Sequence, residues 1–210
     1  MDLDLTVKRI AVTRGNLFAV FAEICAIDIA DGFVFAVSGA AEIRVKDKYP
    51  DMRMVLGASF GSLKEMVKID VTVNDKVTPK ERKFEKARIF DVGMFSLMAY
   101  PIETVLAEKV ETILSRGSSN TRPRDFYDVF VLTGTQPFDK SLFKKALTAT
   151  CKHRGSTAIL AETAERISAI ADSHELQMEW GRYRKLFHYA ANITYGQTIA
   201  ALKTLCEIGE

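Results

Sequence analysis

Two acidic residues near the amino terminus have the type and spacing of metal ligands. Residues 2–7 alternate polar and apolar side chains, which is the pattern of a β-strand with one buried face. Asp2 and Asp4 therefore share a face, roughly 7 Å apart. Carboxylates at that spacing suit hard divalent cations such as Mg²⁺. Because a lone Asp-x-Asp pair is also common on solvent-facing strands, the other residues must decide between these interpretations.

A third carboxylate lies in a second alternating segment. Residues 67–73 predict another half-buried strand, and Asp70 falls on its polar face. Three strand-borne carboxylates are sufficient ligands for two-metal phosphoryl or nucleotidyl transfer. Carboxylate pairs also serve metal-dependent nucleases, so hydrolysis remains an alternative.

A lysine on the apolar face of a predicted helix is the next candidate. Residues 101–116 predict a helix with Lys109 inside an apolar stripe that consists of Ile102, Val105, Leu106, Val110 and Ile113. The opposite side is expected to carry Thr104, Glu108, Glu111 and Ser115. Burying an ammonium without a partner is costly. Lys109 therefore faces an anion or a cleft, or its charged end reaches water along a buried stem.

The following helix, predicted over residues 123–133, begins with two arginines and two aspartates. Asp125 and Asp128 are three residues apart and share a face. Asp125 either compensates the helix dipole or pairs with Lys109 or an arginine and fixes that cation against a phosphate. Five cations could together hold a triphosphate or an RNA backbone: Lys68, Lys109, Arg116, Arg122 and Arg124.

The elements that must position these residues predict an α+β fold. Asn16 is expected to cap a helix that continues to residue 30. Strands are predicted at 33–37, 41–46, 53–60 and 67–73, and the basic stretch 79–88 is predicted to be a loop. Beyond the two helices described above, further helices are predicted at 139–152, 156–171, 175–191 and 194–207. We expect an α+β domain at 1–98 and a helical domain at 99–210.

Composition limits the class of protein. The 210 residues are 48% hydrophobic and 27% charged, which indicates a globular chain. The net charge of +2 implies that any nucleic-acid site is a local patch. Three widely spaced cysteines predict reduced thiols and a cytoplasmic location. The sequence has no apolar run of membrane-spanning length, which predicts no membrane association.

Four segments together resemble the AbiEii/AbiGii nucleotidyltransferase toxin family. They are Asp2-Leu3-Asp4-Leu5, Lys68-Ile69-Asp70-Val71, residues 99–109 and residues 120–128. The most specific part reads E-T-x-L-A-E-K followed by R-x-R-D-x-Y-D. The resemblance extends over most of the chain.

This resemblance implies a polymerase-beta-like nucleotidyltransferase core followed by a helical part that contributes Lys109 and Asp125 to the cleft. Asp2, Asp4 and Asp70 would match the ligands of one or two Mg²⁺ ions. Lys109 would contact the NTP substrate, and Asp125 would match a downstream essential aspartate, with Asp128 and Glu103 as secondary candidates. Family members belong to toxin–antitoxin or abortive-infection systems and transfer nucleotides, some onto tRNA 3′ ends. An antitoxin protein is the partner that the resemblance implies.

The family pattern also includes a Gly-Ser pair before Asp-x-Asp, at the start of a helix that holds the triphosphate. The sequence given begins at Met1, directly before this motif. Two expectations follow. Either the natural start lies upstream, or the product is a weakened enzyme that acts by binding a protein or RNA.

Overall fold

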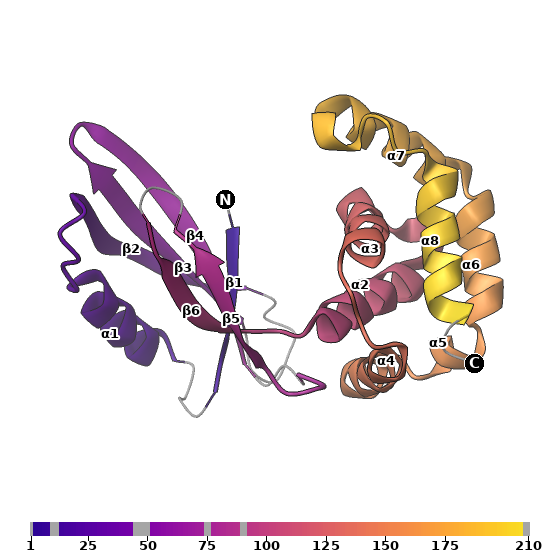
Figure 1. Ribbon diagram of the computed structural model, residues 1–210, viewed down its shortest axis with the longest axis horizontal. Coiled ribbons are helices and arrows are strands. Elements are labelled where there is room, and N and C mark those ends of the chain that lie inside the picture. Colours follow the sequence, from indigo (N-terminus) through magenta and orange to yellow (C-terminus); the bar gives the residue numbers. More distant parts are fainter. Residues whose placement is uncertain (1, 9–12, 44–50, 74–76, 89–91, 208–210) are drawn as a thin grey trace. The chain divides into compact units, whose positions relative to one another are not determined.

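A computed structural model describes residues 2–8, 13–43, 51–73, 77–88 and 92–207 of the chain (Figure 1). The chain forms two compact units, Met1–Asp75 and Lys76–Glu210. The first contains a four-stranded sheet and one helix. The second contains a strand hairpin and the remaining described helices. Each unit is described by itself.

The sheet of the first unit has the strand order β1-β4-β3-β2. Its strands are β1 (Asp2–Val7), β2 (Phe33–Ile43), β3 (Asp51–Phe60) and β4 (Leu63–Val73). β1 runs parallel to β4, and the other neighbouring pairs are antiparallel. Gly61 has a φ of 57° in the turn between β3 and β4, a conformation that glycine adopts at little cost. The parallel pairing places the ends of β1 beside residues that follow it by more than sixty positions.

Helix α1 (Arg14–Cys25) covers one face of this sheet. Thr13 caps the helix by accepting a hydrogen bond from the Asn16 backbone N–H at 3.2 Å. Leu17 and Phe21 are buried against apolar residues of β3 and β4, which include Met54 and Val71. Because side chains alternate along a strand, this packing leaves Asp4 of β1 and Asp70 of β4 on the other face.

The second unit begins with a hairpin of β5 (Arg82–Ala87) and β6 (Met94–Ala99). Its α-helices are α2 (Ile102–Arg116), α3 (Pro123–Thr135), α4 (Lys140–Arg154), α5 (Ala158–Ala161), α6 (Thr163–Asp172), α7 (His174–Leu186) and α8 (Tyr195–Glu207). Two short 3-10 helices are η1 (Gly117–Ser119) and η2 (His188–Ala190).

Helix α2 lies at the centre of the helical packing, in contact with α3 and α4. Leu106, Val110 and Ile113 are completely buried in this core. Trp180 of α7 is also buried, and its Nε1 donates a hydrogen bond to the Ile193 carbonyl at 3.0 Å. The core therefore holds α2 and α3, which carry most of the candidate residues, in a fixed relation.

The α+β prediction is confirmed, but several elements differ from the sequence prediction. The first helix ends at Cys25 rather than residue 30, because the Asp28 carboxylate accepts from the Ala30 N–H at 2.8 Å and forms a turn. Residues 33–43 form one strand with a register shift between Val37 and Gly39, instead of two strands. Positions 44–46 of the predicted second strand lie outside the described residues.

The predicted basic loop 79–88 is wrong, since residues 82–87 pair with β6. All six residues of this strand are exposed, so its charged side chains show no alternation that would indicate a strand. The sequence analysis did not predict its partner, β6, either. The helix predicted at 156–171 is divided at Glu162, and the one predicted at 175–191 ends at Leu186. The boundary between the two compact units falls after residue 75 in the sequence, so the β5–β6 hairpin belongs to the same unit as the helices that follow it.

The three cysteines form no disulfide bond: Cys151 is buried, and Cys25 and Cys206 are half-buried. Over the described residues, each helix is too short or too polar to cross a bilayer.

Candidate functional site

The register of the sheet brings the predicted carboxylates of β1 and β4 together. Asp4 pairs with Asp70, and Asp70 also pairs with Arg53 of β3 on its other side. Paired residues on neighbouring strands project from the same face, about 5 Å apart. In the next row, the hydroxyls of Thr6 and Thr72 lie 2.9 Å apart, as this arrangement requires. Two carboxylates and a guanidinium therefore lie in one row across the polar face of the sheet.

Arg53 holds both oxygens of Asp70. Its Nε donates to Asp70 Oδ1 at 2.6 Å, and its second nitrogen donates to Oδ2 at 2.7 Å. This two-point geometry is the strongest form of arginine–carboxylate pairing. Arg53 was not a candidate in the sequence analysis, because only the pairing of β3 with β4 brings it beside Asp70.

Two of the three predicted carboxylate ligands, Asp4 and Asp70, are placed so that they could bind a hard cation. Asp4 is exposed and pairs in register with Asp70. A carboxylate has about four lone-pair sites, so the ion pair with Arg53 leaves Asp70 with capacity for a metal. The side chain of Asp2 lies outside the described part of the chain. Among the described residues, no cluster of three or more metal-binding side chains forms.

Lys68 belongs to this sheet site. It is exposed on β4, where it pairs in register with Asp2. The sequence analysis grouped Lys68 with cations that follow residue 100. The structure places it in the first compact unit, while those other cations belong to the second.

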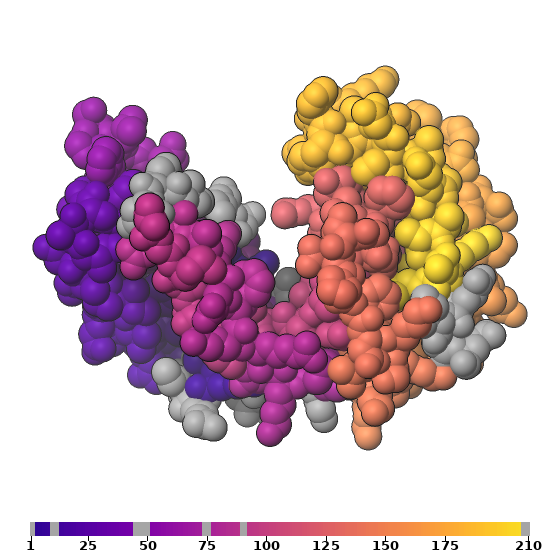
Figure 2. Space-filling view, in the orientation of Figure 1, coloured from indigo at the N-terminus to yellow at the C-terminus, as the bar shows by residue number. Residues whose placement is uncertain are grey.

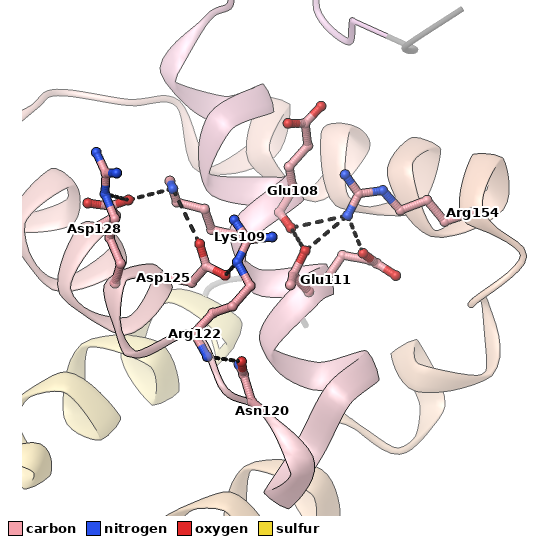
Figure 3. Close-up of polar contacts among 10 residues, drawn as sticks. Glu108, Lys109, Glu111, Asn120, Arg122, Asp125, Asp128 and Arg154 are labelled. Carbon is pink, nitrogen blue, oxygen red and sulfur yellow. Dashed lines mark hydrogen bonds and ion pairs between the residues drawn. The ribbon is translucent and has the colours of Figure 1, made fainter. Parts of the chain in front are cut away.

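The helical unit holds Lys109 between two aspartates (Figure 3). Lys109 Nζ donates to Asp128 Oδ2 at 2.5 Å and lies 3.5 Å from Asp125 Oδ1. The Asp125 side chain is only 4% exposed, whereas Lys109 and Asp128 are about one-fifth exposed, at 22% and 21%. The expected pairing of Lys109 with Asp125 is present, and Asp128 makes the shorter contact.

Arg122 completes this ion cluster, which we define as Lys109, Arg122, Asp125 and Asp128. Arg122 Nε lies 3.1 Å from Asp125 Oδ2. Buried Asn120 accepts from the Arg122 backbone N–H at 2.8 Å and so orders the turn before α3 (Figure 3). The sequence analysis missed Asn120, although an asparagine two residues before a helix N-cap is a recognisable turn signal.

The other predicted cations lie at different distances from the ion cluster. Arg124 is 76% exposed and its Nε lies 4.0 Å from Asp128 Oδ2. Arg116 is exposed at the end of α2, about two turns beyond Lys109. The structure thus brings Arg122 and Arg124 to Lys109 and leaves Arg116 at the helix end.

The buried face of α2 differs from the predicted apolar stripe. The fully buried residues are centred on Leu106, Ala107 and Val110, and Lys109 lies at the margin of this face. Thr104 and Glu111, which were expected on the polar side, are buried. The reason is that α2 packs against α4 as well as α3, which buries a wider arc than one apolar stripe predicts.

Glu111 lies at the centre of a second, separate network. It accepts hydrogen bonds from Ser115 at 2.7 Å and Ser156 at 2.7 Å. It also accepts from Arg154 at 2.5 Å (Figure 3). Burial raises the pKa of Glu111, but the three hydrogen bonds and the charge of Arg154 outweigh burial and hold it below its ordinary value. This network joins α2 to the end of α4 and the segment before α5. No local sequence signal could have indicated it.

Glu103 has a structural contact. It is 2% exposed, and its Oε1 accepts from the Asp139 backbone N–H at 2.9 Å, at the start of α4. Its Oε2 is buried without a hydrogen-bond partner. The contact with α4 accounts for the position of Glu103 within the fold, so its role in a site stays a prediction.

An aromatic cluster borders the ion cluster. It consists of Tyr127, Tyr183, Phe187 and Tyr189, and the hydroxyls of Tyr183 and Tyr189 lie 2.9 Å apart. Burial and the contact with Tyr189 raise the pKa of Tyr183. The charge of Asp128 also raises that pKa, and the charge of Arg124 lowers it.

Comparisons with known proteins identify a family and a similar fold. Residues 1–200 match the family described as nucleotidyl transferase AbiEii toxin, type IV toxin–antitoxin system. The fold is similar to the crystal structure of a candidate nucleotidyltransferase from H. pylori, with a TM-score of 0.50 and 15% identity over 99% of this chain and 77% of that one. The comparison with curated proteins gives no match. Because the family match spans nearly the whole sequence, this chain belongs to the AbiEii family of nucleotidyltransferase toxins.

Proposed function

We propose that this nucleotidyltransferase moves a nucleoside monophosphate from a Mg²⁺-bound NTP to the 3′ end of an RNA, with tRNA as the first candidate acceptor. The observation that supports it most is the register that sets Asp4 beside Asp70 on an accessible sheet face. Oxygen ligands of this kind are those that Mg²⁺ prefers. The family match supports the reaction class.

In this proposal the acidic face of the sheet holds the metal. Asp2, Asp4 and Asp70 are the proposed ligands, and Arg53 pairs with both oxygens of Asp70. Bound Mg²⁺ would polarise the α-phosphate and offset the charge on the departing pyrophosphate. Lys68 at the same face would contribute to phosphate binding.

The ion cluster of the helical unit supplies a second set of proposed phosphate-binding cations. Two carboxylates hold the Lys109 ammonium in one position, so that it can neutralise a phosphate without first being ordered. Asp125 then acts by positioning Lys109 and Arg122. Arg122, Arg124 and Arg116 are proposed contacts for phosphates of the NTP or the acceptor.

The proposal is tested by incubating the chain with Mg²⁺, α-labelled NTPs and tRNA. We expect labelled RNA and equimolar pyrophosphate. Asp4→Asn and Lys109→Met should each reduce transfer at least about 100-fold. Glu65→Gln is the matched control, because Glu65 is an exposed acid on β4 that projects from the opposite face to Asp70. Transfer that persists in Asp4→Asn would contradict the proposed metal site.

The same assay separates the alternatives. A nuclease would shorten the RNA and release no pyrophosphate. Loss of all transfer with retained RNA or protein binding would identify a binding module. One observation favours the binding module, since Arg53 already occupies both oxygens of the third proposed metal ligand. An antitoxin encoded beside this chain is the protein partner to test first.

A further inference from the structure

Two exposed aromatic rings of the aromatic cluster follow helix α7 and have no part in the proposed transfer reaction. Phe187 is 40% exposed and Tyr189 is 53% exposed. Their ring centroids are 5.4 Å apart with an interplanar angle of 30°, a stacked arrangement. Large aromatic side chains at this exposure leave ring faces that are available to a ligand.

Other aromatic side chains of α3 and α7 support the two rings. The Tyr189 ring lies 4.7 Å from Tyr127 of α3, and the Phe187 ring lies 4.7 Å from buried Tyr183 of α7. The Tyr189 hydroxyl also contacts that of Tyr183 at 2.9 Å. Helices α3 and α7 contact each other, and both contribute to the surface of the helical unit (Figure 2). Exposed aromatic residues with such support form a rigid surface rather than a loose end.

Exposed cations lie on the two helices that support these rings, α3 and α7. Arg124 is 76% exposed and its Nε lies 4.0 Å from Asp128, while Asp128 is already hydrogen-bonded to Lys109. Lys185 is exposed in the last turn of α7. Stacking surfaces flanked by cations are typical of proteins that bind single-stranded nucleic acid, because every base has a π-face and every nucleotide a phosphate.

We infer that Phe187 and Tyr189 form a stacking surface for an unpaired base of an RNA strand, with Arg124 and Lys185 contacting its phosphates. The surface selects single-stranded RNA over duplex, since only an unpaired base can present its face to the rings. This inference rests on the proposed function for the role of that strand as acceptor. The binding surface itself can be tested without any transfer reaction.

The test measures the anisotropy of a short fluorescent single-stranded RNA titrated with the full chain, without NTP or metal. Combined Phe187→Ala and Tyr189→Ala should weaken binding about ten-fold or more. Leu186→Ala is the matched control, because Leu186 is 77% exposed in the same segment but has no ring. It should bind within two-fold of the unmodified chain.

Two further variants separate stacking from loss of structure. Tyr189→Phe keeps the ring and removes the hydroxyl contact with Tyr183, so it should retain RNA binding that Tyr189→Ala loses. Arg124→Ala should reduce the slope of log affinity against log salt by about 0.7, the value of one contact to a single strand. Fluorescence of Trp180, the single tryptophan, reports whether the helical unit is folded.

Equal RNA affinity of the ring variants and the Leu186 control would overturn the inference and leave a protein as the better candidate for this surface. Equal affinity for duplex RNA, or tighter binding of matched single-stranded DNA, would also overturn it. Ring-dependent RNA binding in a chain that never transfers nucleotides would contradict the proposed function alone. Transfer to RNA that the ring variants leave unchanged, together with unchanged affinity, would contradict the inference alone.

Discussion

The two units hold their charged residues in different ways. On the sheet, Asp4 is exposed, and the Arg53–Asp70 pair is 37% and 17% exposed. In the helical unit, Asp125 and Glu111 are buried, at 4% and 5% side-chain exposure. An exposed charge stays hydrated and accessible to a metal or phosphate, whereas a buried one depends on its partner. The difference separates residues that solvent and ligands can reach from residues that fix the position of others.

The two helical networks also differ from each other. Lys109 and Asp128 are each about one-fifth exposed and border an exposed arginine. Glu111 is enclosed by two serines and Arg154. We therefore expect changes at Lys109 to affect function first and changes around Glu111 to affect folding first.

The largest expected effect is on the Glu111 network. Arg154→Ala removes the cation from a buried carboxylate and should lower the free energy of unfolding by about 3 kcal/mol. Arg182→Ala is the control, because Arg182 also contacts a glutamate at 2.5 Å but the two are 66% and 40% exposed. That change should cost no more than about 0.5 kcal/mol. Urea unfolding monitored by Trp180 fluorescence gives both values, and equal costs would remove the distinction between buried and exposed pairs.

A second prediction compares aspartates from the two units. Asp125→Asn should cost about 2 kcal/mol of stability, since the amide keeps the shape but weakens the contacts with Lys109 and Arg122. Asp4→Asn, at an exposed position, should change stability by no more than about 0.5 kcal/mol. Far-ultraviolet circular dichroism during urea unfolding reports both units. A large destabilisation by Asp4→Asn would show that the sheet carboxylates serve folding.

A third prediction concerns acid. The pKa of Glu111 lies below its ordinary value of 4.5, so its ionised form binds its partners in the folded state. This contribution is fully present above pH 4.5 and is lost as the pH falls through the lowered pKa. The stability difference between the unmodified chain and Arg154→Ala should therefore shrink by about 1 kcal/mol or more below that pH. A difference that stays constant down to pH 3, measured by the same urea unfolding, would contradict this origin.

The smallest expected effect is that of Arg53→Ala. Because the pair with Asp70 is partly exposed, its removal should cost about 0.5 kcal/mol. It should also release both oxygens of Asp70 for a metal. Isothermal titration of Mg²⁺ tests this second consequence, with Asp4→Asn as the control that removes a proposed ligand. Weaker Mg²⁺ binding in Arg53→Ala would instead show that the arginine holds Asp70 in its binding orientation.

Local patterns in the sequence were enough to predict the class of fold and most elements. Alternation gave the strands around Asp4 and Asp70, and the helices from residue 101 to 133 follow from apolar periodicity with proline at the start. The pairing of Lys109 with Asp125 was also expected, since the two lie on successive predicted helices. These features depend on residues close in sequence, where spacing determines which face a side chain occupies.

Only the tertiary structure decided which distant residues meet. Arg53 reaches Asp70 through strand pairing, Arg154 reaches Glu111 through the packing of α4 on α2, and Tyr189 reaches Tyr127 through the contact of α7 with α3. Strand 82–87 escapes prediction for a different reason: all six of its residues are exposed, so no alternation of buried and exposed positions indicates a strand. Such contacts depend on how whole elements pair and pack, and a charge pattern read along the chain does not contain that information.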